Sequence, residues 1–148
     1  MMRDCRRFTV FCVVLCLSMY MVSCEKKKQE GKVVVSAQEF VLRQDKENSY
    51  IIDAKGKIKN VGEVDVKNVV VTGECRSCSE IWAIGIWTIS GTEKWPYQKD
   101  TINYLPAGKE AEFQFKSVAD FASRPGEPPP NKPDQLGVVV ESFETVDK

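Results

Sequence analysis

Alternation between apolar and polar residues is the feature that most restricts the fold of this chain. Between Tyr50 and Lys59, apolar or small residues occupy one side of an extended chain and charged residues the other. The first set is Tyr50, Ile52, Ala54, Gly56 and Ile58, and the second is Asp53, Lys55, Lys57 and Lys59. Successive side chains of a β-strand point to opposite faces, so this pattern predicts a strand with one buried face.

The rest of the chain has the same character, and turn residues separate its short apolar runs. Further strands are expected at Lys32–Ser36 with Phe40–Leu42 (one strand with an interruption), Val69–Glu74, Ile81–Ile89, Lys99–Leu105, Ala111–Lys116 and Leu136–Phe143. No segment of ten or more residues has a persuasive helical stripe, although a short helical turn is expected over Val118–Ser123. The prediction is an all-β fold, an antiparallel β-sandwich of about seven strands.

A proline-rich segment, residues 124–133, precedes the last expected strand. Proline has no N–H to donate to a strand ladder, so the segment is predicted to be an extended, partly polyproline-like loop. We interpret it as a stiff connector, with a ligand for an aromatic groove as the alternative.

Three motifs resemble the immunoglobulin-like domains of bacterial envelope proteins, the FxLYD and CARDB types. They are Gly56-Lys57-Ile58-Lys59-Asn60-Val61-Gly62, then Val69 with Val71, and Leu105-Pro106-Ala107-Gly108-Lys109-Glu110-Ala111 ahead of Phe113. The resemblance extends from Ile51 to Lys116, and it implies an immunoglobulin-like sandwich without a common catalytic site. The sequence departs from these families at residues 74–78, where Glu74-Cys75-Arg76-Ser77-Cys78 replaces an aspartate–glycine hairpin turn. Gly62 and Gly108 are expected in tight turns with positive φ.

The first 24 residues resemble a bacterial lipoprotein signal. Three arginines precede an apolar run from Phe8 to Val22, and Ser23-Cys24 follows it. The run is shorter than the ~20 residues of a membrane span, and no Ala-x-Ala-like site of a plain secretory signal appears. The resemblance implies a signal peptide at 1–23, acylation of Cys24, a flexible tether at 24–31 and a domain at 32–148.

That resemblance also predicts the location of the protein. The lipid on Cys24 implies attachment to a membrane of the bacterial cell envelope, with the domain facing the periplasm. Glu25 stands where inner-membrane lipoproteins of many Gram-negative bacteria carry aspartate, which favours the outer membrane.

Composition excludes several classes of function. The chain has no histidine, which rules out Ser-His-Asp and Cys-His nucleophiles, His-ligated zinc and covalent c-type haem. Removal of residues 1–23 takes away three arginines and one aspartate, leaving 18 basic and 20 acidic residues and a net charge of −2. A chain with that charge has no basic surface for nucleic acid. No catalytic residue, metal ligand or cofactor is predicted.

Cys75 and Cys78 are the two cysteines left after Cys24 in an exported, oxidising setting. The ends of a four-residue turn are close enough for a disulfide, so we interpret the pair as a staple at the tip of a hairpin. A redox pair is a second hypothesis, although a C-x-x-C enzyme places its first cysteine at the start of a helix, which is not expected here. A metal site or an intermolecular bridge is the third.

Aromatic residues gather in one stretch, with Trp82, Trp87, Trp95 and Tyr97. The predicted strand Ile81–Ile89 is apolar on both faces, so it is either central or has one face that binds a partner. Gly85 within it indicates a bulge or a close approach. These four aromatic residues are candidate binding residues, and packing in the core is the alternative for each.

These observations predict a lipid-anchored envelope protein whose non-catalytic domain makes contact with another protein. A module that binds glycan or peptidoglycan through its surface tryptophans is the first alternative. A periplasmic thiol–disulfide protein that uses Cys75 and Cys78 is the second.

Overall fold

The computed structural model describes residues 30–89 and 93–146. These residues form seven strands and one short 3-10 turn, η2 (Pro96–Gln98). The strands are β1 (Val33–Lys46), β2 (Ser49–Asn60), β3 (Val66–Cys75), β4 (Trp87–Thr88), β5 (Lys99–Leu105), β6 (Glu110–Ala122) and β7 (Leu136–Thr145). The predicted signal peptide and lipidated Cys24 lie outside the described residues.

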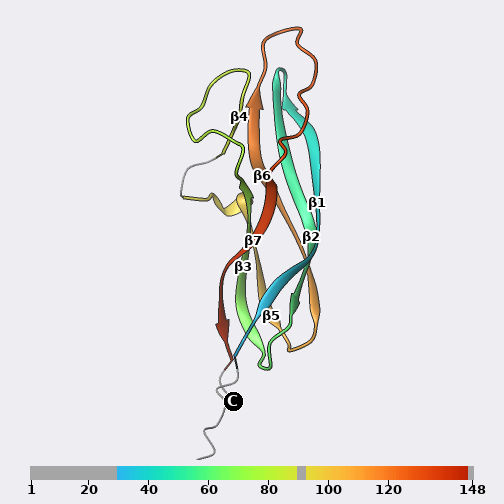
Figure 1. Cartoon of the computed structure of the whole chain (residues 1–148), viewed down its shortest axis with the longest axis vertical. Coiled ribbons are helices and arrows are strands. Elements are labelled where there is room, and N and C mark those ends of the chain that lie inside the picture. Colours follow the sequence, from blue (N-terminus) through green and yellow to red (C-terminus); the bar gives the residue numbers. More distant parts are fainter. Residues whose placement is uncertain (1–29, 90–92, 147–148) are drawn as a thin grey trace, which may run out of the picture.

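The strands form two antiparallel sheets that pack face to face (Figure 1). One sheet has the order β1-β2-β6-β4 and the other the order β5-β3-β7. As in immunoglobulin domains, the first two strands share a sheet and the third crosses to the opposite one. Here β3 is the central strand of its sheet, with β5 and β7 at the edges. The predicted antiparallel β-sandwich of seven strands is confirmed.

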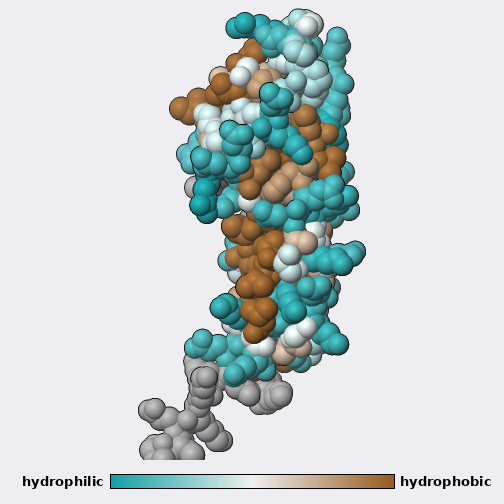
Figure 2. Space-filling model, turned by 45° about the vertical axis from the view of Figure 1, so that its right-hand side comes forward, coloured by the Kyte–Doolittle hydropathy of each residue, from teal (hydrophilic) through white to brown (hydrophobic). Residues whose placement is uncertain are grey.

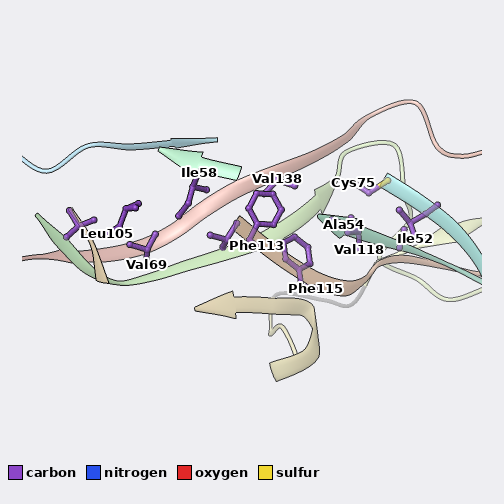
Figure 3. Packing of buried hydrophobic residues seen from close by; sticks show 13 residues of the cluster. Ile52, Ala54, Ile58, Val69, Cys75, Leu105, Phe113, Phe115, Val118 and Val138 are labelled. Carbon is purple, nitrogen blue, oxygen red and sulfur yellow. The ribbon is translucent and has the colours of Figure 1, made fainter. Parts of the chain in front are cut away.

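The core lies between the sheets and is made by the alternation seen in the sequence. Figure 3 shows Ile58 and Phe113 from one sheet near Val69 from the other, and Ile52 and Ala54 near Cys75 further along the core. The charged residues that alternate with them in β2 point away from the core, and two of their lysines pair with glutamates on neighbouring strands. Burial of one face therefore sets the period-two pattern.

The expected interruption in the first strand is a β-bulge within one continuous strand. The pairing of β1 with β2 shifts register between Val35 and Ala37. At this point Gly56 of β2 lies so close to β1 that a Cβ on it would be 2.0 Å from the Ala37 carbonyl oxygen. Glycine is therefore required here by close approach of two backbones.

Asn60 organises the turn region that carries the family-like motifs. Its side chain is fully buried, donates from Nδ2 to the carbonyls of Val64 and Leu105, and accepts from the Gly62 N–H. Gly108 has the expected positive φ, +75°. The expectation for Gly62 was wrong: its φ is not positive, and glycine is needed because a Cβ would lie 2.4 Å from the Lys32 nitrogen.

The predicted helical turn at Val118–Ser123 was also wrong, because β6 continues to Ala122. Ser117 has φ +57°, and the pairing of β2 with β6 shifts register between Ile52 and Ala54. The bulge changes which side chains face the core, so the apolar pattern loses its period of two there.

The two ends of the described chain lie at the same end of the sandwich (Figure 1). Gly31, just before β1, lies against Phe143 and Thr145 of β7 and against Val66 at the start of β3. The loop between β3 and β4 and the proline-rich segment lie toward the opposite end (Figure 1). The domain therefore presents these two segments away from the point where the predicted tether joins it.

Candidate interaction surface

The candidate site is built by residues 76–98, which we call the insertion; residues 90–92 of it lie outside the described part. The chain leaves the β5-β3-β7 sheet after Cys75, adds β4 to the edge of the other sheet beside β6, and returns through η2 to β5. The insertion thus connects the central strand of one sheet with the edge of the other.

A disulfide fixes the start of the insertion. Cys75 and Cys78 are bonded, with their Cα atoms 5.4 Å apart. The predicted pair is confirmed, but it does not close a hairpin, because the strands paired with β3 are β5 and β7. Cys75 is 4% exposed within the core cluster and ends a strand, so it lacks the accessible helix N-terminus that activates a redox cysteine.

The residues after the disulfide form a closed loop with a fixed base. Ser79 donates its N–H to the Trp87 carbonyl (2.9 Å), and the Ile89 N–H donates to the Ser79 carbonyl (3.0 Å). Gly85 donates its N–H to the carbonyl of Ala122 at the end of β6 (2.8 Å). The intervening residues are therefore held to the sandwich at both ends, as in an Ω-loop.

We name residues 81–86 the apolar loop. Ile81 is 78% exposed and Trp82 is 66% exposed, and Ile84 and Ile86 are also exposed. Figure 2 shows a hydrophobic lobe that projects from the upper part of the domain, at the level of this loop in Figure 1. The predicted strand at Ile81–Ile89 is wrong except for Trp87–Thr88.

Gly85 gives the physical reason for that error. Its φ is +85°, and a Cβ on it would have no atom within 4 Å. The residue turns the chain out of an extended conformation, so neither a bulge within a strand nor a close approach explains it.

Trp87 has a structural role, unlike the other candidate aromatic residues. Its ring lies 5.2 Å from that of Phe121 and packs against the core cluster. Its indole N–H donates to the carbonyl of Asn131 (2.8 Å), in the proline-rich segment. Lys132 of that segment donates to the Phe40 carbonyl (3.1 Å). These contacts fit the predicted connector, which is held against the sandwich.

The turn that contains Trp95 and Tyr97, which we name the aromatic turn, is the second exposed part of the insertion. Trp95 is 62% exposed and Tyr97 53% exposed. The turn is held by Gln98, which is only 2% exposed: its Oε1 accepts the Trp95 N–H (2.9 Å), and its Nε2 donates to the Ser117 carbonyl (2.8 Å). The Gln98 carbonyl accepts from Thr72 of β3.

Asp120, a half-buried carboxylate, lies beside the insertion. Burial raises the pKa of Asp120, against the effect of the Ser117 hydroxyl, which donates to its carboxylate at 2.6 Å. Thr88 of β4 donates to the Asp120 carbonyl. Burial also lowers the pKa of Lys94, against the attraction of Asp120. These contacts hold β4 and the returning chain against β6.

The insertion carries no net charge, since it contains Arg76, Lys94, Glu80 and Glu93. Its exposed surface is therefore aromatic and aliphatic without a dominant charge. Within residues 30–89 and 93–146, no three acidic or cysteine side chains are grouped as a metal site would need.

The structure places Trp82, Trp95 and Tyr97 exposed on the insertion, and their role in binding stays a prediction. Sequence reasoning assigned no role to Gln98 or Ser79, which fix the aromatic turn and the base of the apolar loop. Isolated polar residues of this kind carry no pattern that would have revealed their partners.

Comparisons with known proteins return no match: no family model, curated protein or solved structure resembles the chain closely enough to be assigned. The resemblance to FxLYD and CARDB domains therefore remains a prediction from the motifs alone. No helix in the described part of the chain is long and apolar enough to cross a membrane.

Proposed function

We propose that this is a lipid-anchored cell-envelope protein whose non-catalytic β-sandwich contacts a protein partner through the aromatic turn. The lipid on Cys24 holds the chain to the membrane, with the outer membrane favoured by Glu25. The domain faces the periplasm, and the turn lies on its exposed insertion.

The observation that carries this proposal is the exposure of Trp95 and Tyr97 on a turn that buried Gln98 holds rigid. Tryptophan and tyrosine dominate the binding energy of protein interfaces, and a rigid turn loses little conformational entropy on binding. Lys94 and Lys99 flank the turn with charged groups, and a mixture of aromatic and polar groups is typical of an interface.

Cross-linking in intact cells tests the proposal. The wild-type chain is compared with Trp95→Ala and Tyr97→Ala, and captured proteins are identified by mass spectrometry. Tyr104→Ala is the matched control, because Tyr104 is also 53% exposed but lies in β5, outside the insertion. One dominant partner that is lost in both turn variants and kept in the control supports the proposal. Equal capture by all four proteins contradicts it.

Glycan binding is the second candidate for the same turn, because exposed aromatic rings stack on sugars. Soluble peptidoglycan fragments would then quench tryptophan fluorescence saturably in the wild type. Trp95→Ala would abolish the saturable component, while Tyr104→Ala would leave it unchanged. Saturable quenching together with no captured protein would favour this candidate over the first.

A further inference from the structure

The apolar loop differs in chemistry from the aromatic turn. Its sequence, Ile81-Trp82-Ala83-Ile84-Gly85-Ile86, contains six consecutive residues without a charged, hydroxyl or amide side chain. The indole N–H of Trp82 is the one polar side-chain group in it. Protein interfaces carry about one hydrogen bond per 100–200 Å² of buried area, and this loop offers almost none from its side chains.

Some backbone N–H and C=O groups of the apolar loop have hydrogen-bond partners just outside it. The Ser79 hydroxyl accepts from the Ile81 N–H (3.0 Å) and donates to the Ile81 carbonyl (2.9 Å). The Gly85 N–H is bonded to Ala122. Unsatisfied backbone groups are what make an irregular loop costly in an apolar medium, so these bonds lower the cost of removing the loop from water.

From these observations we infer that the apolar loop inserts into the interfacial region of a lipid bilayer. Isoleucine side chains favour the acyl region, and tryptophan favours the headgroup boundary, where its ring is apolar and its N–H remains hydrated. The loop contains no lysine or arginine, so its insertion requires no anionic lipid. This membrane contact is additional to the protein contact proposed for the aromatic turn.

The position of the loop makes this a separate attachment point. The ten residues of β3 carry the chain about 30 Å from Val66, beside Gly31, to Cys75 at the base of the insertion. The loop therefore binds either a second membrane or the same membrane with the long axis of the domain laid along it.

Vesicle flotation tests the inference on residues 24–148 carrying Cys24→Ser, a chain that contains every described strand but cannot be acylated. The probe is a vesicle of uncharged phosphatidylcholine, at low and at high salt. We expect the protein to float with these vesicles at both salt concentrations. The double variant Ile81→Ser/Trp82→Ser should bind at least roughly tenfold more weakly, because two large exposed apolar side chains are lost.

Val41→Ser is the matched control, because Val41 is exposed on β1. It should float like the parent chain, as should Trp95→Ala, which separates this inference from the proposed protein contact. The circular dichroism spectrum of the loop double variant should match the parent, since both changed side chains are exposed. A blue shift of tryptophan emission with vesicles, absent in Trp82→Phe, gives an independent readout.

Three results would overturn the inference. The first is no flotation with phosphatidylcholine. The second is flotation that needs anionic lipid and disappears at high salt, which would assign it to Lys26-Lys27-Lys28 of the predicted tether. The third is flotation that the loop double variant retains. If the parent chain self-associates and the double variant is monomeric, with no vesicle binding by either, the loop is an interface between two copies instead.

Discussion

Replacement of Gln98 by alanine tests how the aromatic turn is held. Gln98 is 2% exposed, and its side-chain amide accepts from the Trp95 N–H and donates to the Ser117 carbonyl. The bond to the Trp95 N–H contributes about 1 kcal/mol net, and the buried Ser117 carbonyl left unpaired costs about 1–3 kcal/mol. We therefore expect Gln98→Ala to lower the free energy of unfolding by about 3 kcal/mol, close to a 12 °C fall in Tm for a domain of this size.

Urea unfolding followed by far-UV circular dichroism measures this change. Gln114→Ala is the matched control, because Gln114 is an exposed glutamine on β6, and its replacement should change stability by under about 0.5 kcal/mol. If Gln98→Ala also changes stability by under about 0.5 kcal/mol, the buried amide does not hold the turn. The aromatic turn would then lack the rigidity that the proposed contact requires.

Three further predictions concern the fold around the insertion. The double change Cys75→Ser/Cys78→Ser should lower the free energy of unfolding by about 2 kcal/mol in a urea titration. The effect is modest because a disulfide that closes a loop of only four residues removes little entropy from the unfolded chain. An unchanged free energy of unfolding would show that the disulfide does not stabilise the fold. Asp120→Asn should be more stable than the wild type at pH 7, because burial raises the pKa of the native carboxyl and penalises its charge. That advantage should shrink as the pH falls toward about 3.9, the ordinary pKa of aspartate. Denaturation midpoints of the variant and the wild type, measured across pH, should therefore converge on acidification. A difference that grows at low pH would refute the prediction. Gly56→Ala should lower the free energy of unfolding by about 3 kcal/mol or more, because the new Cβ would meet the backbone of β1. Gly108→Ala should cost about 1 kcal/mol, because Gly108 has φ +75° but lies in open space. Equal losses in the two variants would contradict the close approach at Gly56.

The strands of the sandwich could be predicted because burial of one face leaves a period of two in the sequence. The strand Lys99–Leu105 has the bounds expected from its residues, and β2 and β7 extend only slightly beyond the expected runs. The prediction worked where polar residues alternate with the apolar ones. There, exposure on one side separates a strand from other apolar segments.

The segment Ile81–Ile89 could not be assigned because it is apolar on both sides. Such a run is expected in a strand that is covered on two faces. In the structure, its first six residues are an exposed loop, and only Trp87–Thr88 pair in a sheet. The spacing of apolar residues in a sequence does not show whether they are exposed. An apolar segment that faces water therefore cannot be distinguished from one in the core.

The other differences come from single residues that act on the backbone. The bulge at Ser117 shifts the inward-facing set in β6, and serine gives no signal for a left-handed conformation. Gln98 holds the aromatic turn through the Trp95 N–H and the Ser117 carbonyl, and Ser117 is distant in sequence. Long-range bonds of this kind depend on how the two sheets meet, which the local pattern does not encode.

Site-specific photocross-linking tests the proposed contact most directly. A photoreactive amino acid with an aromatic ring replaces Tyr97 in the lipidated protein in intact cells, and a second strain carries it at Tyr104, which is equally exposed but outside the insertion. We predict one discrete protein adduct at position 97 and none of the same mass at position 104. The absence of any protein adduct at position 97, or the same adduct at both positions, would contradict an interaction site on the aromatic turn.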